Sequence, residues 1–416
     1  MPNHTSSSGD IVITGVGVTS AIGQGTTDFT TALLNGDHAF SVMRRPGRQV
    51  PTGKGHPATP FLGAELAEVA MPPTVRRGVL RAASLSSRVA LTTLDEAWHD
   101  ARLSEVAPDR IGLVVGGSNL QQRELTQLHA RYADTPEFLS PTYGMTFMDT
   151  DLCGFCTQLY PIRGFAYTLG GASGSGLLAA LQAIRAVQSG LVDACVAVGA
   201  LCDISYWECL AFRAMGAMGS DRYADDASSA CRPFDRHRDG FVYGEACGAI
   251  VVERDRTRHH HAPYARFLGA GTAVDGNRNP NPSLEGEISV IQAALREAKL
   301  NADEIDYVNP HGTGSVIGDE IELQALQHCG LASARINATK SITGHGLTAA
   351  GMVEVIATVL QMRERRLHPT RNLSEPIDTS FNWVEKAAVS DPIDTAVSLS
   401  IGFGGTSSAI CLRRYS

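Results

Sequence analysis

Three polar side chains in glycine-rich segments are the groups in this chain best suited to do chemistry. Ser173 lies in TLGGASGSGLLAALQAI (residues 168–184), and two histidines follow far downstream, His311 in NPHGTGSVIGDEIE and His345 in KSITGHGLTAAGMVE. The sequence before Ser173 predicts a strand and the sequence after it a helix. A serine at such a junction lies at a helix N-terminus, where backbone N–H groups stabilise developing negative charge. An N-cap serine is also an ordinary structural feature, so this segment alone favours no catalytic role.

Glycines and a proline place both histidines in turns. A proline and a glycine flank His311, and glycines stand on both sides of His345. A single histidine in a glycine turn is most often structural or exposed. A serine hydroxyl becomes a useful nucleophile only with a dedicated base beside it. Neither register of GASGSG completes the GxSxG turn of hydrolases, so the motif of a base-activated serine is absent around Ser173.

The elements that would position these residues alternate between strands and helices. β-branched residues at 11–25 predict a first strand, and a helical stripe runs through residues 177–187 with Gly190 placed to end the helix. A further helix is expected over residues 80–100. Strands separated by helices predict an α/β protein with buried sheets. The other strand-like runs are IGLVVGG (111–117), ACVAVGA (194–200), GAIVVE (248–253) and AVSLSIGFGG (396–405).

Composition disfavours several classes of partner. The formal net charge of −8 and the pI near 5.9 argue against nucleic acid or an anionic membrane surface as the main partner. The sequence predicts no bilayer-spanning stretch and no signal peptide, so a cytoplasmic protein is expected. The CGFC pair, Cys153 and Cys156, lacks a second pair to complete a zinc site, and the histidines at 259–261 stand in a charged segment. No metal site is therefore expected.

The serine segment and the two histidine segments resemble the active-site motifs of β-ketoacyl synthases, the condensing enzymes of fatty acid and polyketide assembly. Further matches are RPFDRHRDGFVYGEACGAIVV (residues 232–252), the opening strand, and SIGFGGTSS near the C-terminus. The resemblance implies an α/β, thiolase-like fold of two similar halves in five layers, α/β/α/β/α. It places the N-terminal half at residues 1–260 and the C-terminal half at 261–416. An echo between IVITGVG near the start and VSLSIGFGG near the end is in keeping with a duplication.

The resemblance also assigns roles to individual residues. The position matching Ser173 is the family's acyl-carrying cysteine, so this site lacks its thiol. His311 and His345 match the pair whose ring N–H groups grip the thioester carbonyl of a malonyl unit, and a joint role is expected for them. Lys340 matches the lysine that holds this network and tunes histidine protonation, and Phe403 the phenylalanine that gates the pocket and completes an oxyanion hole. Supporting acidic residues and substrate contacts are expected at Asp319, Glu322, Glu354, Thr313 and Gly404.

Without the thiol, the resemblance implies that acyl transfer onto the protein fails while decarboxylation survives. The expected reaction converts malonyl-acyl carrier protein to acetyl-acyl carrier protein, as in the stand-alone serine-for-cysteine decarboxylases of polyketide β-branching cassettes. The substrate would arrive on the phosphopantetheine of the carrier protein, with no other cofactor, and the product would feed a hydroxymethylglutaryl-synthase-like enzyme. A basic rim for the carrier is expected at Arg76, Arg77 and Arg81, and a homodimer through the sheet edge near residues 190–200.

Three alternatives stay open at this level. A condensing β-ketoacyl synthase could use Ser173 as a slow nucleophile. A non-catalytic, chain-length-factor-like subunit of a ketosynthase heterodimer would act through its partner, although such subunits usually lack the histidines that stand here at His311 and His345. An acyltransferase or hydrolase built on Ser173 would need a base that no motif supplies.

Overall fold

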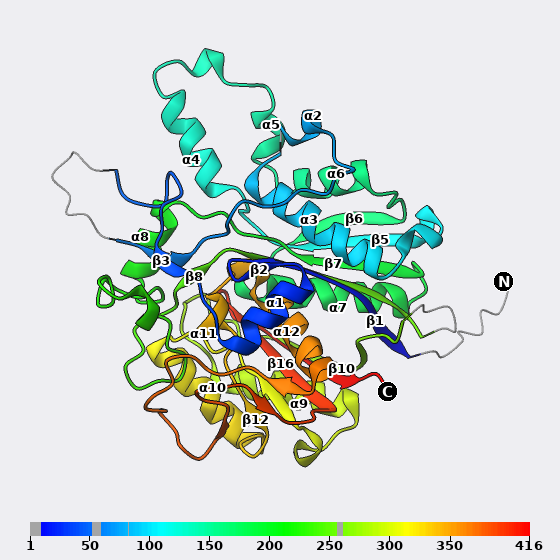
Figure 1. Ribbon diagram of the computed structural model, residues 1–416, viewed down its shortest axis with the longest axis vertical. Coiled ribbons are helices and arrows are strands. Elements are labelled where there is room, and N and C mark those ends of the chain that lie inside the picture. The colour runs from blue at the N-terminus through cyan, green and yellow to red at the C-terminus, as the bar shows by residue number, and fades with distance from the viewer. Residues whose placement is uncertain (1–9, 52–59, 82, 256–260) are drawn as a thin grey trace.

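One long sheet runs through the protein. The computed structural model describes residues 10–51, 60–81, 83–255 and 261–416 (Figure 1). From edge to edge the main sheet has the order β6-β5-β7-β9-β1-β10-β17-β16-β11-β12-β14, and the short β2 pairs with β1. The strands of its N-terminal part are β1 (Ile11–Ser20), β2 (Gly23–Gln24), β5 (Ile111–Gly116), β6 (Phe165–Leu169), β7 (Ala194–Gly199) and β9 (Ala246–Arg254). Those of its C-terminal part are β10 (Ala265–Val274), β11 (Tyr307–Asn309), β12 (Arg335–Ile336), β14 (Asn382–Trp383), β16 (Thr395–Gly402) and β17 (Thr406–Arg414).

The main sheet contains the same strand unit twice. Each unit has five strands, which can be numbered in the order they occur along the chain. Across the sheet they then stand in the order third, second, fourth, fifth and first, as β6-β5-β7-β9-β1 in one unit and β12-β11-β16-β17-β10 in the other. In both units the fifth strand is antiparallel to its two neighbours, while the second, third and fourth are parallel. The units join where β1 pairs with β10, Val12 opposite Arg266 and Ile13 opposite Ala265. This topology makes β1 equivalent to β10 and β16 equivalent to β7. The sequence echo between the first strand and β16 therefore links strands that are not equivalent.

Helices cover both faces of each unit and produce five layers (Figure 1). On the outer face of the first unit α3 packs on β1 and β9 beside α6, the pair α7 and α12 lies between the units, and α9 packs on β10 and β17 beside α10. The thiolase-like α/β fold expected from the sequence is confirmed. The helices are α1 (Thr26–Asn35), α2 (Arg77–Leu80), α3 (Leu85–Asp100), α4 (Gln122–Arg131), α5 (Tyr143–Thr146), α6 (Thr150–Leu159), α7 (Ser175–Gln188), α8 (Tyr206–Ala214), α9 (Leu284–Ala298), α10 (Val316–His328), α11 (Lys340–Thr343) and α12 (Ala350–Glu364).

Two small sheets complete the strand inventory of the described residues. One contains β3 (Phe40–Val42), β4 (Leu62–Ala64) and β8 (Tyr243–Gly244), and the other β13 (Arg366–Leu367) with β15 (Val389–Ser390). Within the same residues, no helix has the length and apolar character needed to cross a membrane.

Local signals set the helix ends. The helix expected over residues 80–100 begins later, at Leu85, because Ser84 caps it: the Ser84 hydroxyl accepts the Ser87 N–H at 3.0 Å. After α7 the chain turns at Gly190, which has a φ of 76° that favours glycine, so the predicted stop is confirmed.

Residues 190–200 do not form a sheet edge, contrary to the sequence-based expectation. Residues 194–199 are β7, which is buried and pairs with β5 on one side and β9 on the other. The crossover that follows β5 places β6 outside it, so β6 is the edge strand of the N-terminal unit. A dimer interface at this end of the sheet would therefore involve residues 165–169.

The two central helices bring together segments far apart in the sequence. α12 is buried along residues 350–362, as expected of a helix that is apolar on nearly every face. A Cβ on Gly176 would lie 2.8 Å from the Met352 nitrogen, and one on Gly351 would lie 3.1 Å from Leu177 Cβ. These glycines allow α7 and α12 to pack closely. As a result, the turn before α7 lies against the turn before α12.

Candidate active site

Ser173 lies in a single helical turn between β6 and α7. This turn, Ala172–Gly174, directly precedes Ser175 at the start of α7. Ala172 has a left-handed φ of 47°, which is strained for a residue with a side chain. Ser400 on β16 donates its hydroxyl to the Ser173 carbonyl at 3.2 Å. A strand of the second unit thus holds a turn that belongs to the first.

His345 follows α11, and its hydrogen bonds determine which ring nitrogen carries the proton. The His345 N–H donates to the Val242 carbonyl at 2.7 Å and fixes the backbone. The Leu347 N–H donates to Nδ1 of His345 at 3.2 Å, so Nδ1 is an acceptor and the proton of the neutral ring lies on Nε2. Nε2 is 3.0 Å from Ser173 Oγ and donates to it. His345 is therefore a donor toward Ser173 and not a base that could deprotonate it.

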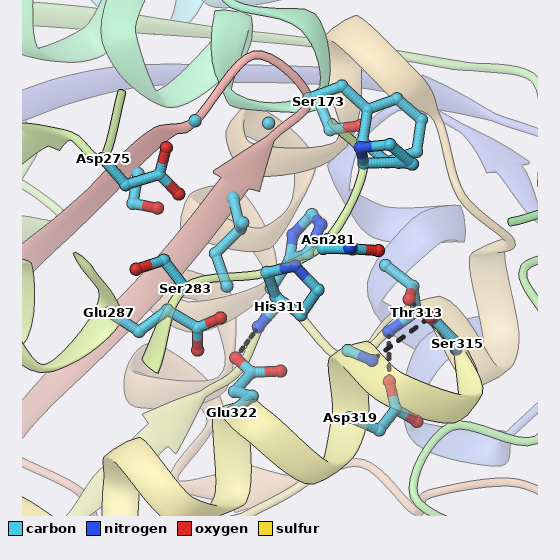
Figure 2. Close-up of a pocket in the computed structure, with 18 of the residues that line it drawn as sticks. Ser173, Asp275, Asn281, Ser283, Glu287, His311, Thr313, Ser315, Asp319 and Glu322 are labelled. Carbon is cyan, nitrogen blue, oxygen red and sulfur yellow. Dashed lines mark hydrogen bonds between the residues drawn. The ribbon is translucent and has the colours of Figure 1, made fainter. Parts of the chain in front are cut away.

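His311 lies in the loop between β11 and α10, and two carboxylates of α10 hold that loop (Figure 2). The His311 and Gly312 N–H groups donate to Glu322 at 2.5 and 2.8 Å. The N–H groups of the next two residues donate to Asp319 Oδ1 at 3.2 and 3.1 Å. The rings of His311 and His345 lie 5.5 Å apart between centroids, at 84°. The two carboxylates thus fix the loop that places His311 beside His345.

Lys340 lies behind His311 and fixes its tautomer. Lys340 Nζ donates to the His311 carbonyl and to Glu354 Oε1, and it lies 3.3 Å from His311 Nδ1. An ammonium group can only donate, so Nδ1 of His311 accepts and the ring proton lies on Nε2. Lys340 is 2 % exposed and Glu354 1 % exposed, so each charge depends on the other for compensation.

Burial keeps both imidazoles neutral. Burial and the nearby Lys340 ammonium lower the pKa of His311 well below its usual value, with a smaller contribution from His345. The same two causes lower the pKa of His345. Burial raises the pKa of Asp319 to about 6 and that of Glu354 to about 7. At neutral pH the site therefore offers two uncharged rings, each with its N–H on Nε2.

A pocket opens in front of the serine and the two histidines. Ile401 near the end of β16 and Phe403 just after that strand line the pocket. Asp275 and residues 279–283, which follow β10, also line it, and Figure 2 shows Asp275, Asn281 and Ser283 among them. The Phe403 side chain is 39 % exposed and lies against Phe212, with 6.3 Å between ring centroids. A substrate in this pocket would meet Ser173, His311 and His345 together.

Comparison with known families decides what this site belongs to. The N-terminal domain of β-ketoacyl synthases matches residues 8–258, and the C-terminal domain of the same enzymes matches residues 264–374. The chain belongs to the β-ketoacyl synthase family. The motif resemblance assigns Ser173 to the position that carries cysteine in the condensing enzymes, and this assignment stays a prediction.

Curated and crystallographic relatives cover nearly the whole ketosynthase chain. The polyketide biosynthesis malonyl-ACP decarboxylase PksF of Bacillus subtilis is 57 % identical over 406 residues, 97 % of this chain and 96 % of PksF. The 3-oxoacyl-(acyl-carrier-protein) synthase 2 of Rhizobium meliloti is 33 % identical, over 97 % of this chain and 99 % of that enzyme. A crystal structure of a β-ketoacyl synthase from Burkholderia phymatum matches with a TM-score of 0.86 at 26 % identity, covering 98 % of this chain and all of that one.

Some of the residues predicted for the ketosynthase site line the pocket, and others lie behind it. Those that line the pocket are Ser173, His311, His345, Thr313, Phe403, Asp319 and Glu322. Lys340 lies behind His311 and contacts its Nδ1, and Glu354 accepts a hydrogen bond from Lys340. Gly404 has a left-handed φ of 87° and stands between Phe403 and Gly405, which both line the pocket. The catalytic role of each remains a prediction.

Sequence reasoning missed one wall of the ketosynthase pocket. Asp275, residues 279–283 and Glu287 line it but belong to none of the quoted family motifs. The signal available was the polar, turn-rich run NRNPNPS before α9, which predicts a loop but no position for it.

The described residues of the two motifs expected not to bind metal are not among those that line this pocket. Cys153 and Cys156 are both buried in α6 as free thiols, and burial raises the pKa of Cys153 to about 12. Of the histidine run, His261 contacts Asp100, whereas residues 259 and 260 lie outside the described part of the chain.

Proposed function

We propose that this protein decarboxylates malonyl-acyl carrier protein to acetyl-acyl carrier protein without condensation, as a supply step for polyketide β-branching. The observation that carries the proposal is the pair of neutral imidazoles with both Nε2–H groups at one pocket, beside a serine that has no base. The identity to PksF, named a malonyl-ACP decarboxylase, supports the same reaction.

The geometry suits stabilisation of an enolate. A thioester carbonyl placed between the Nε2–H groups of His311 and His345 would accept both, with His345 exchanging its hydrogen bond to Ser173 Oγ for one to the carbonyl oxygen. When the carboxylate leaves as CO2, its bonding electrons move through the α-carbon onto the carbonyl oxygen. The hydrogen bonds from these fixed neutral donors strengthen as negative charge develops on the oxygen. They therefore stabilise the transition state more than the bound substrate.

Ser173 is poorly equipped to accept an acyl chain. Its hydroxyl accepts from His345 Nε2–H, so no acceptor nitrogen is available there to remove its proton. Condensation requires an acyl group on that residue. The absence of base activation therefore separates decarboxylation from condensation and disfavours the condensing and hydrolase alternatives.

The partners follow from the proposed substrate. The malonyl group would enter on the phosphopantetheine of an acyl carrier protein, and the acetyl product would pass to a hydroxymethylglutaryl-synthase-like enzyme in the cytoplasm. Arg76 and Arg81 are exposed and suit an acidic carrier, while the Arg77 side chain lies outside the described part of the structure. A homodimer is proposed through the edge strand β6, on which Tyr167 is 41 % exposed.

Ser173→Cys is expected to restore acyl acceptance. A thiol ionises far more readily than a hydroxyl and does not depend on a neighbouring base to the same extent. Incubation with an acyl-thioester donor should therefore add the acyl mass to the cysteine variant but not to the unaltered protein. Ser173→Ala, the matched control, should keep CO2 release, measured with malonyl-carrier protein. Loss of CO2 release in Ser173→Ala would contradict the proposed division of roles.

Gly402→Ala is expected to damage the site. The added Cβ would lie 2.3 Å from the Gly171 carbonyl oxygen and 3.1 Å from the Gly174 nitrogen, so the turn that carries Ser173 must move. We expect a stability loss of about 1–3 kcal/mol by thermal melting and a loss of CO2 release of about 10²-fold. Gly154→Ala in α6, where a Cβ meets nothing within 4 Å, is the control and should change neither. CO2 release at the unaltered rate in Gly402→Ala would show that the position of the turn carrying Ser173 does not matter for the reaction.

A further inference from the structure

Glu287 is a buried acid in the pocket wall that has no role in the loss of CO2 proposed above. It lies in the first turn of α9, is 2 % exposed, and lines the same pocket as Ser173 and the two histidines. Both of its carboxyl oxygens lack a hydrogen-bond partner among the described residues. Figure 2 shows this carboxyl directed into the pocket, beside the Glu322 carboxyl. A buried polar group without a partner is costly, so its presence calls for a ligand.

We propose that Glu287, as a neutral carboxylic acid, delivers the proton that the α-carbon takes up after CO2 leaves. This inference rests on the decarboxylation proposed above. Loss of CO2 leaves an enolate, and acetyl-carrier protein forms only when that carbon gains a proton. The O–H bond of Glu287 breaks, a C–H bond forms with the enolate's electron pair, and the thioester carbonyl is restored.

The surroundings of Glu287 keep it protonated. The charged or titratable groups that face it are Glu322 and Asp319 on α10, with Asp275 after β10 and His311 after β11 on the same pocket. Burial raises the pKa of Glu287 well above its usual value, and ionisation of the neighbouring Glu322 or Asp319 raises it further. After the proton is given up, the same neighbours favour its recovery from water that enters through the pocket.

The other N–H and O–H groups near the enolate are already engaged or are weak acids. The Nε2–H groups of His311 and His345 hold the carbonyl oxygen in the proposed mechanism. Lys340 donates to the His311 carbonyl, to His311 Nδ1 and to Glu354. The Ser173 hydroxyl is a far weaker acid than a carboxyl group. Burial also raises the pKa of the pocket-lining Glu322 to about 8, but its two oxygens accept the His311 and Gly312 N–H groups. The Glu287 carboxyl has no such partner among the described residues, so its proton is both acidic and uncommitted.

A role for Glu287 in binding the malonyl carboxylate is less favourable on energetic grounds. A hydrogen bond to that carboxylate would stabilise the bound substrate and disappear as CO2 forms. Such an interaction raises the barrier, whereas a donor aimed at the carbon acts only as the reaction proceeds. The two roles differ in the kinetic constant they affect.

The test compares Glu287→Gln with Glu285→Gln, an exposed glutamate two positions earlier on the same helix. Acetyl-carrier formation from malonyl-carrier protein is measured across pH. Glu287→Gln should lower kcat by about 10²-fold with little change in KM, and Glu285→Gln should match the unaltered protein. In the unaltered protein kcat should fall as the pH rises through the pKa of Glu287, because only the protonated acid can donate. The Gln variant should lack this fall.

Each other outcome has a definite meaning. An unchanged kcat in Glu287→Gln overturns the inference, and so does an effect confined to KM, which would assign Glu287 to substrate binding. If Glu287→Gln fails to fold, the pH profile of the unaltered protein provides the test. A kcat that does not fall with rising pH, up to the pH at which the protein unfolds, overturns the inference. Failure of the unaltered protein to release CO2 would instead overturn the proposed function itself.

Discussion

His311→Ala is expected to slow CO2 release from malonyl-carrier protein by about 10²–10³-fold, because one of two N–H donors to the enolate oxygen is lost. His345→Ala should have a similar effect. Removing both should cost less than the product of the two losses if they act as a unit on one oxygen. KM should change much less than kcat, because these hydrogen bonds strengthen only as charge develops.

The pH dependence gives an independent check on the same two residues. Because the pKa values of His311 and His345 lie well below the usual histidine value, both rings stay neutral as the pH falls through that range. The two imidazoles should therefore contribute no inflection to the rate near the ordinary histidine pKa. His328→Ala, at the exposed end of α10, is the control and should leave the rate unchanged. A His311→Ala protein that releases CO2 as fast as the unaltered protein would contradict the proposed mechanism.

Lys340→Met is expected to reduce both stability and activity. The free energy of unfolding should fall by about 3–5 kcal/mol, since the variant leaves Glu354 buried without its counter-charge. Burial already raises the pKa of Glu354 to about 7, and loss of Lys340 removes an influence that lowers it. The folded variant must then keep this carboxyl protonated while the unfolded chain ionises it. The loss should therefore grow as the pH rises, which denaturant titrations at pH 6 and pH 8 would measure.

A double variant separates the two effects of Lys340. Lys340→Met with Glu354→Gln removes both charges, so most of the stability should return. Activity should stay low, because no ammonium then holds Nδ1 of His311 as an acceptor and the ring can adopt the other tautomer. Full activity in the double variant would show that the His311 tautomer does not depend on Lys340. A single variant as stable as the unaltered protein at pH 8 would contradict the buried-pair argument.

Sequence motifs identified the polar residues of this site more completely than the other residues that line its pocket. Ser173, His311 and His345 stand in glycine-rich segments that are specific enough to recognise, and the fold brings them to one pocket. The proximity of Ser173 and His345, 172 positions apart, follows from the packing of α7 on α12. That packing depends on glycines at the helix contact, which sequence alone does not pair.

The features that could not be predicted depend on three-dimensional surroundings. The tautomer of His345 is set by the Leu347 N–H, a backbone group present in every sequence. The protonation of Glu287 depends on α9 packing against α10, which buries it near Glu322. The edge strand was misplaced because apolar runs such as ACVAVGA indicate a buried strand but not its order in the sheet.

The most direct test is intact-mass analysis of malonyl-carrier protein and of this protein after incubation together with an acyl-thioester donor. The proposed function predicts that the carrier loses the mass of CO2 and becomes acetyl-carrier protein, that Ser173 carries no acyl group, and that no elongated β-ketoacyl product forms. An elongated product would mean that Ser173 condenses. The result that would contradict the decarboxylase is malonyl-carrier protein that stays unchanged even when the carrier is the cognate one. That result would favour the non-catalytic subunit.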